Sequence, residues 1–138
     1  MARRDAIIDA SIIIQHTRAR NKRNSFFLRS LLAYDPLLSA ISVYEIEIGA
    51  YRAGRSSDMT ALQLDFKIMP FTEEIARRAA RLDADLIRHN LQTGIKDTFV
   101  AATCLVHRLP LLSVNTRHFE RIKDLELIDL NNLPSVDE

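Results

Sequence analysis

Short apolar runs alternate with longer amphipathic stretches along the chain. Three runs, at residues 6–8, 37–41 and 111–114, predict buried strands, because strands covered on both faces read as continuous branched aliphatic residues. Residues 67–71 and 125–128 predict two further strands. We therefore expect a sheet whose strands are well separated in sequence.

Helices are predicted between these strands from apolar residues at intervals of three and four positions. Their expected ranges are about 12–20, 25–34, 42–53, 57–65, 72–90 and 97–107. Strands that alternate with helices are typical of a mainly parallel sheet with helices on both faces. The predicted fold class is thus α/β, a three-layer α/β/α sandwich.

Bulk composition indicates one domain over residues 1–138, with a polar C-terminal tail from about 131. The chain has 138 residues, 47% of them hydrophobic, and no Gly/Ser/Pro-rich linker. Its single cysteine, Cys104, is predicted to be a core thiol. The first apolar run is broken by Asp9, so we expect neither a signal peptide nor a membrane span, and hence a cytoplasmic protein. The net charge of +1 leaves attraction to nucleic acid to local patches.

Four oxygen-bearing side chains are predicted to meet at one edge of the sheet. Asp9 ends the first strand, Glu45 opens the helix after the second, and Asn115 follows residues 111–114. Asp97 opens a helix that runs antiparallel to the strands and so begins at the same edge. Clustered carboxylates repel one another unless a cation neutralises them, and oxygen-only ligands suit Mg²⁺ or Mn²⁺. Such an ion favours phosphodiester hydrolysis.

Each of these residues also has an ordinary structural interpretation. Ser42 and Glu45 have the spacing of a capping box, and Asp97 could be a helix N-cap. Asp9 could belong to a turn, and Asn115 to an Asx-turn. These interpretations do not explain why metal-capable side chains recur along one edge.

Four sequence segments resemble the PIN-domain family, in particular its VapC-type toxins. They are residues 7–11 (IIDAS), 42–49 (SVYEIEIG), 97–102 (DTFVAA) and 113–122 (SVNTRHFERI). The resemblance covers nearly the whole chain, in order and with matching spacing. It implies a PIN-like fold and a metal-dependent endoribonuclease that is the toxin of a type II toxin–antitoxin system.

The resemblance also implies roles for individual residues and partners. Asp9, Glu45 and Asp97 become metal ligands, with Asn115 where many family members have Asp. Ser11 and Ser113 become hydroxyls that support these ligands. The implied partners are an RNA substrate, a VapB-like antitoxin and a second copy of the chain in a homodimer, with no membrane.

Basic residues near the predicted edge are candidates for RNA phosphate contacts. The densest run holds Arg18, Arg20, Lys22 and Arg23, and Arg117 follows Asn115. By contrast, the arginines of residues 77–88 are interspersed with acids and predict an exposed face of mixed charge. None of the four histidines is assigned as a catalytic base.

Two other functions remain open from the residues alone. An inactive PIN-like module that binds RNA or protein is compatible with Asn115 in place of an acid. A Mg²⁺-binding phosphoreceiver domain needs an aspartate at the end of the middle strand, and residues 69–71 offer none. A dinucleotide site is disfavoured because no glycine-rich fingerprint follows the first strand.

Overall fold

A four-stranded parallel sheet forms the centre of the computed structural model, which describes residues 3–57 and 66–137. The strand order is β3-β2-β1-β4. The strands are β1 (Arg4–Ile8), β2 (Tyr34–Ser39), β3 (Lys67–Met69) and β4 (Leu111–Leu112). The helices are α1 (Ala10–Arg18), α2 (Phe26–Ala33), α3 (Ala40–Arg52), α5 (Glu73–Arg88), α6 (Ile95–His107), α7 (Thr116–Phe119) and the 3₁₀ helix η1 (Leu130–Asn132).

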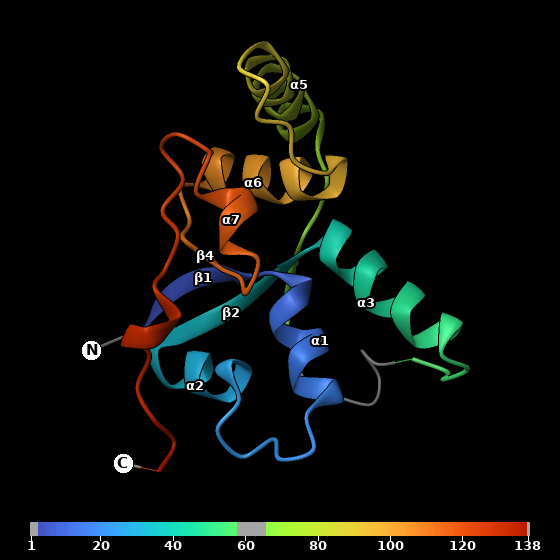
Figure 1. Ribbon diagram of the computed structural model, residues 1–138, viewed down its shortest axis with the longest axis vertical. Coiled ribbons are helices and arrows are strands. Elements are labelled where there is room, and N and C mark those ends of the chain that lie inside the picture. Colours follow the sequence, from blue (N-terminus) through green and yellow to red (C-terminus); the bar gives the residue numbers. More distant parts are fainter. Residues whose placement is uncertain (1–2, 58–65, 138) are drawn as a thin grey trace.

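Successive strand residues point to opposite faces of the sheet and so build two cores. Ile7, Leu37 and Leu111 face α6, whereas Ile8, Leu38 and Leu112 face α1 and α2. All six are buried, and each isoleucine or leucine stabilises the fold by about 1.5–3 kcal/mol. Helices cover both faces, and α5 lies outside α6 (Figure 1). The predicted α/β/α fold with a parallel sheet is confirmed.

The boundaries of β2 and β4 differ from the prediction. β2 begins at Tyr34 and includes Pro36, which pairs with Ala6 of β1, because the fixed φ of proline suits an extended strand. β4 has two residues instead of four, since the chain turns at Ser113. Residues 125–128 form no strand, only an isolated bridge between Leu127 and Leu111, so that prediction is wrong. The helix expected over 57–65 lies, apart from its first residue, outside the described residues.

Helix α5 is strongly amphipathic and packs on α6. Thr72 caps its N-terminus by accepting a hydrogen bond from the backbone N–H of Ile75. Glu73, in the first turn, interacts favourably with the positive end of the helix dipole. Ile75 and Ala79 are buried against α6, whereas the outer faces carry charged residues. Burial of this apolar stripe fixes α5 with its charges directed outward.

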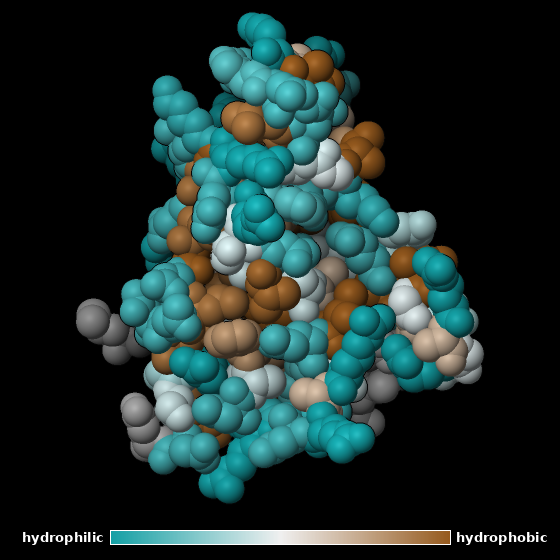
Figure 2. All heavy atoms as spheres, viewed as in Figure 1, coloured by the Kyte–Doolittle hydropathy of each residue, from teal (hydrophilic) through white to brown (hydrophobic). Residues whose placement is uncertain are grey.

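The C-terminal tail returns along α2. Arg29 donates hydrogen bonds to the carbonyl oxygens of Leu133 and Pro134, 2.9 and 3.2 Å away. Arg23, in the loop before α2, forms an ion pair with Asp137. Figure 2 shows the hydrophobic surface of this face gathered across the middle of the molecule, whereas the end that carries α5 is mostly hydrophilic. Within residues 3–57 and 66–137, we find no helix with the length and apolar character needed to span a bilayer.

Candidate metal-binding active site

Asp9 lies where β1 ends and α1 begins, and it is almost completely buried. It occupies the N-cap position of α1, yet its carboxylate does not cap the helix. Instead Oδ2 accepts hydrogen bonds from the hydroxyls of Ser11, at 2.6 Å, and Ser113, at 2.8 Å. Ser113 Oγ in turn accepts from the backbone N–H of Asn115, at 2.9 Å. The side chain of Asp9 is therefore held from two segments that are far apart in sequence.

Glu45 does not belong to a capping box, so that alternative is wrong. Because β2 ends at Ser39, this serine is the N-cap of α3, and its hydroxyl accepts from the backbone N–H of Ser42. Glu45 therefore lies beyond the first turn and makes no cap. Among the described side chains, its Oε1 atom is the buried oxygen or nitrogen that lacks a hydrogen-bond partner. An unpartnered buried carboxylate oxygen costs stability unless a ligand satisfies it.

Asp97 does not cap a helix either. The N-cap of α6 is Gly94, and Asp97 is the third residue of the helix. Its Oδ2 lies 2.8 Å from Nδ1 of His118, which belongs to α7. An ionised carboxylate accepts here, so the imidazole donates from Nδ1. His118 is a site residue that the sequence analysis missed, although it lies within the matched segment 113–122.

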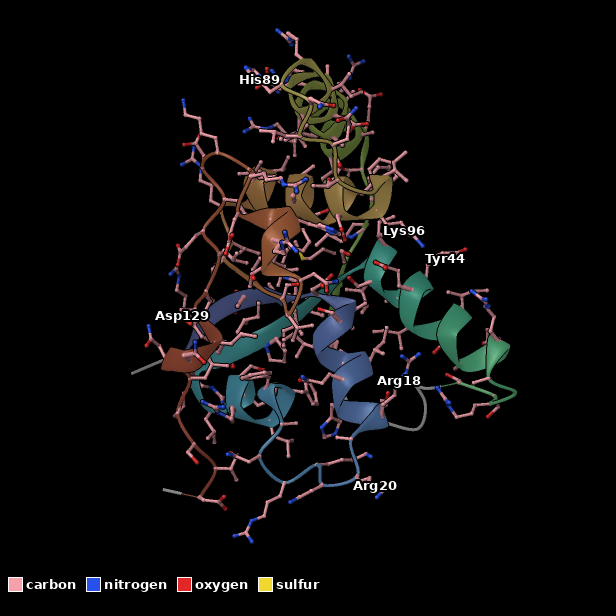
Figure 3. All side chains as sticks on the ribbon, in the orientation of Figure 1. Arg18, Arg20, Tyr44, His89, Lys96 and Asp129 are labelled. Carbon is pink, nitrogen blue, oxygen red and sulfur yellow. The ribbon has the colours of Figure 1, made fainter. Side chains whose placement is uncertain are left out.

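The three carboxylates, Asp9, Glu45 and Asp97, share one site that we term the acidic edge. Burial raises the pKa of Asp9, and the charge of Asp97 raises it further, against the lowering effect of the two serine hydroxyls. Burial and the charges of Asp9 and Asp97 raise the pKa of Glu45 to about 7, partly offset by Lys96. Lys96 lies over the ring of Tyr44, where the starts of α6 and α3 meet (Figure 3). The acidic edge is thus electrostatically unfavourable without a counter-cation.

The donor set at the acidic edge fits a hard divalent cation. The atoms that suit a cation are carboxylate oxygens, one of them unpartnered, whereas Nδ1 of His118 is already engaged with Asp97. Across the described ranges no group of three or more His, Cys, Asp or Glu side chains is already arranged to hold a metal ion. Asn115 follows Ser113 at the start of α7, with an exposed side chain. The ligand roles of these residues stay predictions.

The basic run does not lie near this edge, so its predicted position is wrong. Helix α1 begins at the acidic edge and runs away from it, which leaves Arg18 and Arg20 at its far end (Figure 3). Lys22 donates to the carbonyl oxygen of Ala19, and Arg23 pairs with the tail. Arg117 is exposed on α7, next to His118. Contact of any of these residues with RNA stays a prediction.

Comparisons of the sequence and of the fold with known proteins give matches to the PIN domain and to VapC proteins. The model of the PIN domain family matches residues 6–125. Ribonuclease VapC10 of Mycobacterium tuberculosis is 28% identical over 120 residues, which cover 87% of this chain and 90% of that protein. Ribonuclease VapC1 of Rickettsia felis is 29% identical over 135 residues, covering 91% and 96%. The crystal structure of VapBC2 from Rickettsia felis bound to a promoter DNA fragment superposes with a TM-score of 0.77 at 18% identity, covering 89% of this chain and 96% of that one.

Proposed function

Since the chain belongs to the PIN domain family, we infer that it is a ribonuclease toxin of the VapC type, from a type II toxin–antitoxin system. The relatives that match nearly end to end carry the name ribonuclease. The observation that carries the chemistry is the buried, unpartnered oxygen of Glu45 beside Asp9 and Asp97. The three acids also count against an inactive binding module.

We propose that Asp9, Glu45, Asp97 and Asn115 hold Mg²⁺ or Mn²⁺ at the acidic edge. When bound, such an ion neutralises the clustered carboxylates and lowers the pKa of water for in-line attack on a phosphodiester. Asn115 contributes a neutral carbonyl oxygen, so the site carries one negative charge fewer than it would with Asp at this position. The three remaining acids, Asp9, Glu45 and Asp97, suffice to hold one ion firmly.

The surrounding residues orient the acids. Ser11 and Ser113 fix the carboxylate of Asp9 through two hydroxyl hydrogen bonds to one oxygen. His118 holds the carboxylate of Asp97 at the start of α6. In the metal-free protein Glu45 retains its proton up to pH about 7, so loading of the site releases a proton from this carboxyl.

Cleavage of RNA with analysis of the new ends tests the proposed function. The wild-type protein with Mn²⁺ should leave a 5′-phosphate on the downstream fragment, because water attacks phosphorus and the 3′-oxygen of the upstream fragment leaves as a hydroxyl. EDTA should abolish cleavage, and Asp97→Asn should remove most of it. Cyclic phosphate ends, or cleavage that persists in EDTA, would contradict the proposal. Glu120→Gln, a change of the same kind at an exposed position, is the control.

We also propose that an antitoxin covers the acidic edge. Structural neighbours include toxin–antitoxin complexes, among them one from Klebsiella pneumoniae. A basic segment led by an arginine suits the site, since a guanidinium can bind carboxylates with two hydrogen bonds. Such a segment should compete with Mn²⁺ for the site in a calorimetric titration. A complex whose acidic edge stays open would exclude this form of inhibition.

A homodimer is the remaining proposed assembly. Tyr44, Ile48 and Tyr51 lie on one side of α3 and are exposed, which supplies apolar surface for a second copy to cover. Light scattering should give a mass near twice 15.8 kDa. A monomer at micromolar concentration would refute it. An RNA substrate also makes the cytoplasm the proposed compartment.

A further inference from the structure

A second polar site lies between α5 and the segment that follows α7. It is a surface cavity of about 430 Å³, which is within the range of small-ligand pockets. Positions 78, 81 and 85 share one face of α5 and, with His89 just after the helix, form one wall, and residues 121–124 form the other. Figure 3 shows His89 at the end of this helix, above α6. None of the lining residues belongs to the acidic edge.

Positive charge predominates in this cavity, which we term the cationic cavity. Its cations are Arg78, Arg81, Arg121 and Lys123, and its acids are Asp85 and Asp124. Asp85 already has a partner, because it pairs with Arg88 outside the cavity at 3.4 Å. Within the described parts of the chain, none of the four cavity cations takes part in an ion pair. The positive charge is therefore available to a ligand.

One short segment, α7 and the residues that follow it, connects the cationic cavity to the acidic edge along the chain. His118 contacts Asp97 at the acidic edge. Three residues later, Arg121 lines the cavity and donates to the carbonyl oxygen of Gln92, in the loop that leads into α6. The same short segment thus contributes one residue to each site.

We propose that the cationic cavity binds backbone phosphates of the RNA strand beside the bond that is cleaved. This inference rests on the proposed ribonuclease function. Guanidinium groups match phosphate with paired hydrogen bonds, and a lysine adds a point charge. Contacts to phosphate position a strand without reading its bases. The cavity therefore contributes affinity and alignment, not sequence preference.

Salt-dependent binding of RNA without metal tests this proposal. The probe is a labelled single-stranded RNA of about twelve nucleotides, followed by fluorescence anisotropy in EDTA at about 0.05–0.3 M KCl. Log K falls linearly with log salt. Removal of one cation that binds a phosphate should make this slope less steep by about 0.7, which is about a fivefold decrease in affinity at about 0.1 M. Arg81→Gln with Lys123→Gln should show twice that slope change, whereas Arg81→Lys with Lys123→Arg should retain most of the affinity.

The matched control removes the same charge elsewhere. Arg52→Gln with Lys67→Gln changes two exposed cations outside the cavity and should leave the slope unchanged. All substituted positions are exposed, so thermal melts should coincide with wild type.

The outcomes separate this inference from the function on which it rests. Equal decreases in RNA affinity for the cavity and control variants would indicate that the overall positive charge of the protein attracts RNA, and would overturn the inference. An unchanged salt slope in the cavity variant would also overturn it. In either case, cleavage by the wild type with Mn²⁺ leaves the ribonuclease function standing. A wild-type protein that neither binds nor cleaves RNA overturns both.

Discussion

Replacing Glu45 with Gln probes the acidic edge through the stability of the metal-free protein. The pKa of Glu45 is raised from 4.5 to about 7, chiefly by burial and then by Asp9. Between these pH values the folded protein keeps a proton that the unfolded chain has released. The free energy of unfolding therefore falls as the pH rises through this interval. Gln is neutral throughout and should remove this dependence.

The size of the effect follows from the shift. Each pKa unit corresponds to about 1.4 kcal/mol, so the full shift is about 3.5 kcal/mol. Glu45 is only partly buried, and solvent screening reduces the usable value to about 1–2 kcal/mol. Glu45→Gln should thus be more stable than wild type by that amount near pH 8 and equally stable near pH 4.5. In a chain of this length the difference at high pH is about 4–8 °C in Tm.

Circular dichroism melts in EDTA across this pH range supply the measurement. Glu120→Gln makes the same chemical change at an exposed residue and should shift Tm equally, by little, at every pH. Saturating Mn²⁺ should raise the Tm of wild type more than that of Glu45→Gln, because ligand binding stabilises the folded state. Parallel pH profiles for wild type and Glu45→Gln would refute the electrostatic account of the site.

Other contacts give predictions of different kinds. His118→Ala frees the carboxylate of Asp97 and should weaken Mn²⁺ binding about tenfold by calorimetry; unchanged affinity would show that the imidazole does not orient this ligand. Ile8→Ala empties a fully buried position and should lower the free energy of unfolding by about 2–5 kcal/mol in urea, and a decrease below about 1 kcal/mol would mean that the core collapses around it. Burial and then the charge of Lys22 lower the pKa of His16, so stability should fall as the pH drops below the ordinary value of 6.5; an NMR titration midpoint at or above 6.5 would contradict this.

The sheet was predictable because the buried ends of its strands are short, continuous apolar runs. Ile7 and Ile8 face opposite cores, and so do Leu37 and Leu38, which is why neither pair shows polar alternation. The acidic edge followed from topology, since parallel strands end on the same side. The ends of helices and strands were harder to predict. Ser39 and Ser42 are equally good N-cap residues in the sequence, and only the end of β2 decides between them.

What sequence reasoning missed depends on tertiary packing or on helix direction. The bond between His118 and Asp97 joins two helices, and no periodic pattern marks an exposed histidine as a partner. The cationic cavity needs α5 beside residues 121–124, and the sequence of α5 alone indicates only a face of mixed charge. The position of the basic run has a simpler cause: the 9-residue α1 starts at the edge and carries Arg18 about 13 Å from it.

The hydrogen bond from Ser113 to Asp9 spans 104 positions of the chain, and this has a consequence during translation. A nascent polypeptide leaves the ribosome with its N-terminus first, and its early segments can fold before the rest is made. Asp9 emerges about a hundred residues before Ser113 and β4, which complete its surroundings. Prematurely terminated products therefore lack the assembled acidic edge. A cell that makes this nuclease meets its activity only after Ser113 has been synthesised, which leaves time for a partner to be present.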